Sequence, residues 1–245
     1  MKLKQYVLCV SLVFSAQFAF AANSQVFHTS EGSVIAKVYS APSASKAPAV
    51  ILLHGYQCIA ACALDYERYA LALTKQNFDV YDLEYYNEAD YTALQQNRLD
   101  GEAYATRFQR WASEVRQVIE QVKALPRANG AVALLGFSQG GRIAIASAAN
   151  NPAVSALVVL YARLPNAAEM QSEIRTLPPL LLIHGNADTV VPLQDGNAIF
   201  AKAQTLGATA EMVVYPGAGH GFDFSADAPA AISARRHVSA FLGKD

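Results

Sequence analysis

The sequence carries little net charge and contains no block of like charges. Of its 245 residues, 19 are Lys or Arg and 20 are Asp or Glu, which gives a formal net charge of −1. This balance provides no electrostatic reason to expect nucleic acid as a partner. Internal repeats and low-complexity tracts are also lacking, which argues against a repeat architecture. The length and the 53% hydrophobic content suit one compact domain with a large core.

Cysteine is scarce as well. The chain has three cysteines, Cys9, Cys58 and Cys62, and no His, Asp or Glu is spaced with them as in a zinc site. We therefore expect neither a metal nor another cofactor.

The first 22 residues differ from the rest of the chain. Lys2 and Lys4 form a short basic start, the apolar run YVLCVSLVF follows, and small residues end the segment in AFAA. This order predicts a secretory signal peptide, residues 1–22, cleaved after Ala21 or Ala22. An uncleaved anchor and a buried helix are the alternatives, but the apolar run is short for a membrane span. We expect a single domain, residues 23–245, that is periplasmic or secreted and has no stable membrane anchor after cleavage.

Apolar runs of strand length alternate with amphipathic segments along this domain. The runs AVILLHG, AVALLGF, ALVVLYA and LPPLLLIHG are unbroken, as in strands that are covered on both faces. Two short strands around Glu31 and Gly32 read as a hairpin. The segment EAYATRFQRWASEVRQVIEQVKAL has helical spacing, with an apolar stripe of Phe108, Trp111, Val115, Val118, Ile119 and Val122. This alternation predicts an α/β fold, with a mostly parallel central sheet and helices on both faces.

Polar residues directly after the strands are the candidates for chemistry, because ligands bind at the carboxyl ends of parallel strands. The strand AVALLGF runs into GFSQGG, in which Gly136, Ser138 and Gly140 match the pattern G-x-S-x-G between a strand and a helix. A sharp turn at this point exposes Ser138 as a nucleophile. The alternative is a serine that caps a helix in a glycine-rich turn.

Two further residues complete a catalytic triad. Asp188 follows the strand PLLLIHG, and His220 lies between two glycines after the last predicted strand. Imidazole is suited to general-base work near neutral pH, and a carboxylate orients it. The chain order serine, aspartate, histidine is the one that an α/β-hydrolase requires. Asp195 is the weaker candidate for the acid, because it lies further from the strand end.

The oxyanion of an acyl-transfer reaction needs two amide donors. We expect one from the backbone N–H of Gln139, directly after the nucleophile, and the other from the backbone N–H of Tyr56, after the strand AVILLHG. His54 and His184 each precede a glycine at a strand end, and we interpret both as structural residues.

The motifs LLHG, GFSQGG, LIHGNADTVVP and GAGHGF together resemble the dienelactone hydrolase family of α/β-hydrolases. The resemblance extends from about Val50 to the C-terminus, and it implies the α/β-hydrolase fold with Ser138, Asp188 and His220 as nucleophile, acid and base. That family typically has a cysteine nucleophile and a cytoplasmic location, whereas this chain has Ser138 and a predicted export signal. The departures favour a serine esterase, a lipase-like or polyester-type hydrolase, or a peptidase-like relative.

Residues that contact the substrate are less evident in the sequence. Arg163 follows the strand ALVVLYA and is a candidate to bind a substrate carboxylate, as arginines do in the resembling family; an exposed arginine without a role is the favoured alternative. The segment YDLEYYNEADY either lines the cleft in part or forms a packed strand followed by a solvated loop. No large insertion separates the strands, so we expect no large cap.

Three functions remain at this stage. The first is hydrolysis of a small-molecule carboxylic ester through an acyl-enzyme intermediate. The second is amide cleavage by a peptidase-like hydrolase with the same residues. The third is a non-catalytic binding protein on a hydrolase scaffold, although such a protein has no need of an intact triad.

Cys58 and Cys62 remain in the mature chain and follow the strand that leads to Tyr56. Ser138 already provides the nucleophile, and two thiols alone make a weak metal site. An oxidising compartment favours a Cys58–Cys62 disulfide, with two free thiols as the alternative.

Overall fold

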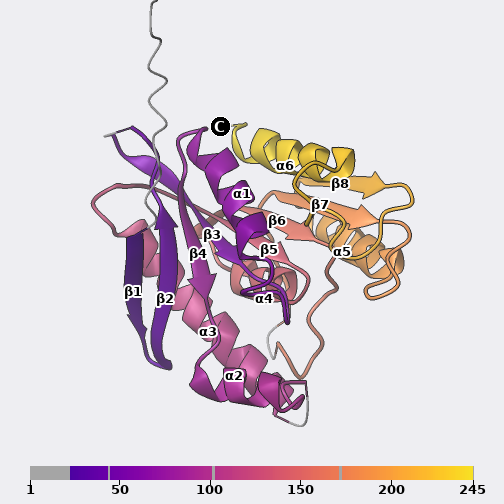
Figure 1. The fold of residues 1–245 in the computed structure, drawn as a ribbon, viewed down its shortest axis with the longest axis horizontal. Coiled ribbons are helices and arrows are strands. Elements are labelled where there is room, and N and C mark those ends of the chain that lie inside the picture. Colours follow the sequence, from indigo (N-terminus) through magenta and orange to yellow (C-terminus); the bar gives the residue numbers. More distant parts are fainter. Residues whose placement is uncertain (1–22, 44, 101–102, 171–172, 245) are drawn as a thin grey trace, which may run out of the picture.

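An eight-stranded sheet forms the centre of the molecule (Figure 1). This computed structural model describes residues 23–43, 45–100, 103–170 and 173–244, so the predicted signal peptide lies outside the described residues. The strand order is β1-β2-β4-β3-β5-β6-β7-β8, with β1–β2 and β2–β4 antiparallel and all other pairs parallel. The strands are β1 (Asn23–Thr29), β2 (Gly32–Tyr39), β3 (Ala47–Leu53), β4 (Asp79–Glu84), β5 (Ala128–Phe137), β6 (Val154–Leu160), β7 (Leu180–Gly185) and β8 (Ala210–Tyr215).

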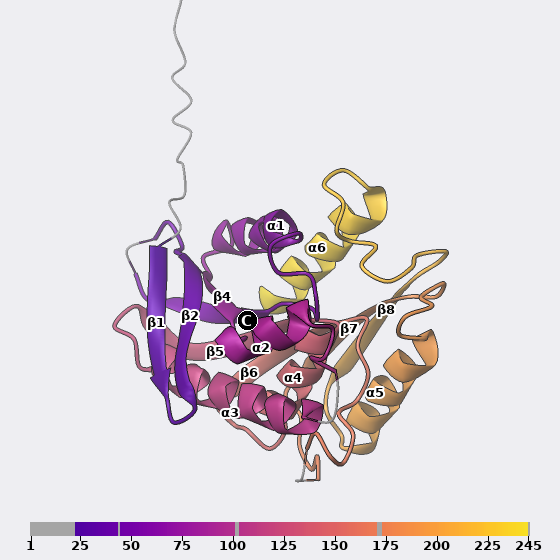
Figure 2. The same cartoon turned by 60° about the horizontal axis from the view of Figure 1, so that its bottom comes forward.

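Helices cover both faces of this sheet, as the sequence predicts. Helices α1 and α6 lie on one face, and α3, α4 and α5 lie on the other (Figure 2). The helices are α1 (Ala63–Thr74), α2 (Glu88–Gln95), α3 (Tyr104–Lys123), α4 (Gln139–Ala148), α5 (Leu193–Thr205) and α6 (Pro229–Leu242). None of the helices in the described ranges is both long and apolar enough to cross a membrane.

The core consists of two layers, one on each face of the sheet. In β5, Leu134 packs into the layer beneath α3 and α4, while its neighbour Leu135 packs into the layer beneath α1 and α6. Alternate residues of a strand point to opposite faces of the sheet. When both faces are covered, every residue of the strand is buried, and apolar residues are favoured at each position. This geometry explains the unbroken apolar runs. The whole predicted stripe of α3 is buried, including Trp111.

One helix was not expected from the sequence. The segment YDLEYYNEADY contains the end of β4, as expected, but α2 begins at Glu88 where a solvated loop was one of the two interpretations. Asn87 caps this helix: its side chain accepts from the Asp90 N–H at 3.0 Å, and the Asp90 carboxylate accepts from the Asn87 N–H at 3.0 Å. This reciprocal cap is a local signal that spacing of apolar residues alone does not reveal.

Asp90 also joins α2 to α3, and it is almost completely buried. Its carboxylate accepts a hydrogen bond from Trp111 Nε1 at 2.9 Å and pairs with Arg110. We expect Asp90→Ala to lower the free energy of unfolding by about 3 kcal/mol, because it leaves the buried Trp111 N–H without an acceptor and deprives the partly buried Arg110 guanidinium of one of its two carboxylate partners. Urea denaturation measures the change. Glu88→Gln, on the exposed side of the same turn, is the control, with an expected cost below about 1 kcal/mol; equal losses in the two variants would contradict the prediction.

Candidate active site

Ser138 occupies a sharp turn between β5 and α4. Its φ of 52° is in the left-handed region, which residues other than glycine rarely adopt. The surrounding backbone allows no bulk: a Cβ added to Gly136 would lie 2.4 Å from the Gly140 carbonyl oxygen, and one added to Gly140 would lie 2.2 Å from the Leu53 carbonyl oxygen. The two glycines of the predicted motif therefore let the turn pack against the end of β3.

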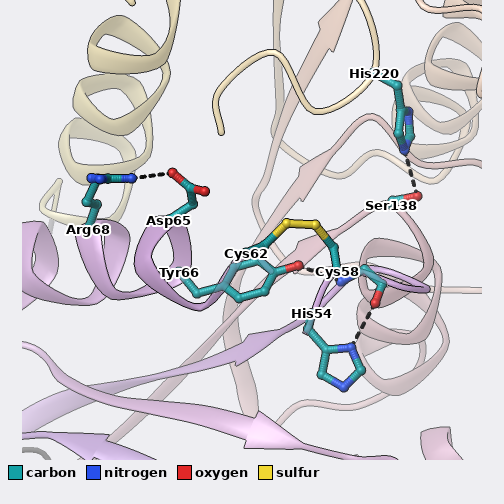
Figure 3. The surroundings of a disulfide bond; sticks show 9 residues. His54, Cys58, Cys62, Asp65, Tyr66, Arg68, Ser138 and His220 are labelled. Carbon is teal, nitrogen blue, oxygen red and sulfur yellow. Dashed lines mark hydrogen bonds and ion pairs between the residues drawn. A yellow bond between two sulfur atoms is a disulfide. The ribbon is translucent and has the colours of Figure 1, made fainter. Parts of the chain in front are cut away.

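The structure brings Ser138, His220 and Asp188 together in one chain of hydrogen bonds. His220 Nε2 lies 3.0 Å from Ser138 Oγ, and His220 Nδ1 lies 2.8 Å from Asp188 Oδ2. The Ser138–His220 contact is drawn in Figure 3. The three residues follow β5, β7 and β8, so each comes from the carboxyl end of a different strand. Asp188, and not the weaker candidate Asp195, is the carboxylate in contact with the imidazole.

The Asp188 carboxylate is buried and held in place by backbone donors. Its Oδ1 atom accepts from the N–H groups of Val190 at 2.9 Å and Val191 at 2.8 Å. These bonds use one oxygen and leave Oδ2 to face His220. His184 supports the same loop: its Nε2 atom lies 2.8 Å from the Val191 carbonyl oxygen, in agreement with a structural role.

A pocket of about 420 Å³ opens beside Ser138. Tyr56 and Gln139, the two expected oxyanion donors, both line it. Gln139 is the first residue of α4, where a backbone N–H has no acceptor within its own helix. Arg163 lines the pocket as well, with a partly exposed side chain 3.7 Å from Glu169. The structure therefore places Arg163 at the pocket, and its exposure agrees with both interpretations of this residue. A larger hollow of about 820 Å³ lies over α2, and no member of the triad lines it.

Glu169 is a site residue that sequence reasoning missed. It is buried, it forms an ion pair with Arg142 of α4, and both side chains line the pocket. Arg142 also donates to the hydroxyl of Tyr104 at 3.0 Å. Glu169 lies on an irregular segment after β6, where no periodic pattern marks it.

Tyr85 and Tyr86 lie beneath the pocket rather than in its wall, and neither lines it. The Gln139 side chain donates from Nε2 to the Tyr86 hydroxyl at 2.7 Å and to the Tyr85 hydroxyl at 3.3 Å. Burial raises the pKa of both phenols well above the ordinary value, so both stay neutral and can donate hydrogen bonds. The cleft-lining interpretation of YDLEYYNEADY is thus wrong for these two residues.

Cys58 and Cys62 form a disulfide beside this site (Figure 3). Their Cα atoms are 5.1 Å apart, and Cys62 directly precedes α1. Within the described residues, no group of three or more His, Cys, Asp or Glu side chains is arranged to hold a metal ion.

The chain is similar to known proteins both in sequence and in fold. The chain is 35% identical over 98 residues to a protein of Methylorubrum extorquens named as a carboxymethylenebutenolidase; the match covers 36% of this chain and only 33% of that protein. The solved structures that share the fold include the following two. One is a protein of Klebsiella pneumoniae named as a dienelactone hydrolase (TM-score 0.72, 19% identity, 92% of this chain and 100% of that one). The other is esterase 2 of Thermogutta terrifontis phosphonylated by cyclosarin (TM-score 0.70, 17% identity, 91% and 93%).

A family model extends this likeness to most of the chain. The model of the dienelactone hydrolase family matches residues 35–244, a range that contains Ser138, Asp188 and His220. By this match, the chain belongs to the dienelactone hydrolase family.

Proposed function

We propose that the protein is a serine hydrolase that cleaves carboxylic esters of small molecules through an acyl-enzyme intermediate. The observation that carries this proposal is the hydrogen-bonded chain Ser138–His220–Asp188 at the edge of a pocket. Membership in the dienelactone hydrolase family supports the same reaction class. A fold neighbour described as a phosphonylated esterase agrees with it.

In this proposal each group of the site has a role in the reaction. Ser138 Oγ attacks the ester carbonyl carbon while His220 Nε2 accepts the hydroxyl proton, and Asp188 stabilises the imidazolium that forms. The oxyanion accepts hydrogen bonds from the N–H groups of Tyr56 and Gln139. The intermediate collapses to the acyl-enzyme, and the leaving alkoxide takes the proton from His220. Water then loses a proton to His220 and attacks the acyl carbon. The bond between the acyl carbon and Ser138 Oγ breaks, the acid leaves, and Ser138 Oγ takes the proton back from His220.

We expect Ser138→Ala to lower kcat/KM on a short p-nitrophenyl ester by about 10⁴-fold or more, because the nucleophile is lost while the pocket remains. The wild-type protein should react with a fluorophosphonate probe at Ser138, and the variant should not. Ser155→Ala, on an exposed position of β6, is the matched control and should leave both readouts unchanged. Turnover retained in a pure, folded Ser138→Ala protein would refute the mechanism.

The two alternatives give different results in the same assays. An amide hydrolase would cleave anilides faster than esters of the same acyl group. A binding protein would leave the fluorophosphonate probe unreacted although the triad is intact.

Arg163 is the proposed contact for an anionic group on the substrate. Its neighbour Arg142 forms a close ion pair with the buried Glu169, whereas Arg163 lies 3.7 Å from the same carboxylate and its side chain is 42% exposed at the pocket. We expect Arg163→Ala to lower kcat/KM about 10-fold for a monoester of a dicarboxylic acid, since it removes a charge-assisted hydrogen bond. The value for the matched neutral ester should stay within about 2-fold, since the triad is untouched. Equal losses on both esters would argue against a specific contact.

We further propose that the protein is exported and that residues 1–22 are removed. The order of basic, apolar and small residues in that segment supports this, and the disulfide is a bond that oxidising compartments favour. Intact-mass analysis of the protein recovered from the bacterial periplasm should give a chain that begins at Ala22 or Asn23. A thiol assay on this protein after denaturation should detect no free thiol. A full-length mass or two reactive thiols would contradict export or the disulfide, respectively.

A further inference from the structure

The peptide unit between Gly55 and Tyr56 has a fixed orientation. The Gly55 carbonyl oxygen lies 2.8 Å from His54 Nδ1, a contact drawn in Figure 3. No cis peptide bond occurs in the described residues, and in a trans unit the C=O and the N–H point in opposite directions. The Tyr56 N–H is therefore directed away from the imidazole. A Cβ added to Gly55 would lie 3.8 Å from Ser138 Cβ, which places this peptide beside the nucleophile.

Three tyrosines hold the other polar backbone groups of the same loop. Tyr66 Oη accepts from the Gly55 N–H at 2.9 Å. Tyr85 Oη donates to the His54 carbonyl oxygen at 2.7 Å, and Tyr86 Oη donates to the Tyr56 carbonyl oxygen at 3.0 Å. The Tyr56 N–H makes no hydrogen bond to any of the described residues. This N–H is thus a donor that stays free for a ligand.

His54 is built into this arrangement as a donor. It is 2% exposed and its ring stacks on Tyr85, with the centroids 3.9 Å apart and the planes within 5°. Its Nδ1 atom contacts the Gly55 carbonyl oxygen. The other ring nitrogen, Nε2, lies 3.2 Å from Glu84 Oε1, at ion-pair distance but without the alignment of a hydrogen bond. A carbonyl oxygen and a carboxylate oxygen can only accept, so both contacts of this ring, with Gly55 and with Glu84, are attractive when each ring nitrogen carries a proton.

Glu84 is suited to hold the ring in this orientation. Burial alone would raise the pKa of its carboxyl, but contacts with His54, the Tyr91 hydroxyl and the Tyr86 N–H lower that pKa below the ordinary value. Glu84 is therefore charged at neutral pH. Asp82 lies two residues earlier on β4. Together with His54 and Glu84 it lines a cavity of about 300 Å³, and burial raises the pKa of its carboxyl to about 6.

We propose that His54, oriented by Glu84, is a positioning residue of the oxyanion hole: it fixes and polarises the Gly55–Tyr56 peptide so that the Tyr56 N–H donates to the developing oxyanion. A hydrogen bond accepted by the C=O of a peptide strengthens the N–H of the same unit as a donor. A donor already in place also costs no reorganisation during the reaction. The proposal rests on the ester hydrolysis proposed above. It differs from the sequence-based interpretation of His54 as a purely structural residue.

Two substitutions distinguish a positioning role of His54 from a purely structural one, because each leaves a hydrogen-bond donor at a different place. The amide nitrogen of Asn lies where Nδ1 lies, whereas that of Gln lies where Nε2 lies. We expect His54→Gln to lower kcat and kcat/KM together by about 10- to 100-fold, less than the loss of a whole oxyanion donor. KM should stay within about 2-fold, because the oxyanion exists only in the transition state. His54→Asn should recover most of the loss.

Glu84→Gln tests the orienting carboxylate without a change in size. We expect kcat to fall about 3- to 10-fold, since the ring keeps its donor and loses only the charge that holds it. Asp82→Asn, on the same face of β4, and His28→Asn, on the exposed strand β1, are the matched controls and should retain wild-type kcat. Thermal unfolding of each variant and active-site titration with the fluorophosphonate probe correct kcat for the fraction of folded protein.

Each outcome decides the proposal. Wild-type kcat in folded His54→Gln, or equal losses in His54→Asn and His54→Gln, would overturn it, as would a loss that disappears after active-site titration. If the wild-type protein reacts with the probe but cleaves no ester, the proposed function fails, and the rates of probe reaction in the same variants then decide the role of His54. If the wild-type protein does neither, both proposals are wrong.

Discussion

The approach of the Ser138 turn to the end of β3 is the contact on which the site depends. Gly140 lies so close to the carbonyl oxygen of Leu53 that no side chain fits between them. This contact sets the distance between the nucleophile, which follows β5, and the loop of His54, Gly55 and Tyr56, which follows β3. The parallel pairing of β3 with β5 keeps the ends of these two strands aligned, with Leu53 opposite Gly136. The two proposed oxyanion donors, the N–H groups of Tyr56 and Gln139, therefore come together from segments that are distant in the sequence.

Aromatic side chains and the disulfide fix the position of the loop of His54, Gly55 and Tyr56. Tyr66 belongs to the first turn of α1, and Cys62, which precedes this helix, accepts the Tyr66 N–H at its carbonyl oxygen. The Cys58–Cys62 bond thus closes the chain between the loop and the helix that bears Tyr66. Such a short closed loop contributes only about 2 kcal/mol to global stability in the chain-entropy model. Its local effect, a fixed start of α1 and hence a fixed acceptor for the Gly55 N–H, bears more directly on the site.

Two imidazole–carboxylate pairs flank the nucleophile, and they differ in exposure and in geometry. His220 is partly exposed, and its hydrogen bond to Asp188 is well aligned. His54 is buried, and its contact with Glu84 lacks that alignment. The first pair faces the hydroxyl of Ser138, and the second faces a backbone carbonyl. In the proposed roles, the first pair accepts a proton from Ser138 and the second orients the Gly55–Tyr56 peptide.

The sequence by itself determined the order of strands and helices, the turn at Ser138 and the candidates Asp188 and His220, because each depends on residues close to one another in the chain. The pattern G-x-S-x-G, for example, is a local requirement of one strand-to-helix turn. The sequence did not reveal α2, which is marked by a capping motif and not by periodic apolar residues, or the position of Glu169 at the pocket. It left two interpretations of Arg163 open. Only the tertiary structure decided that His54 meets Glu84 and that Tyr66, Tyr85 and Tyr86 surround one loop. These partners are up to 31 residues apart, and they meet only where neighbouring strands end at the same edge of the sheet.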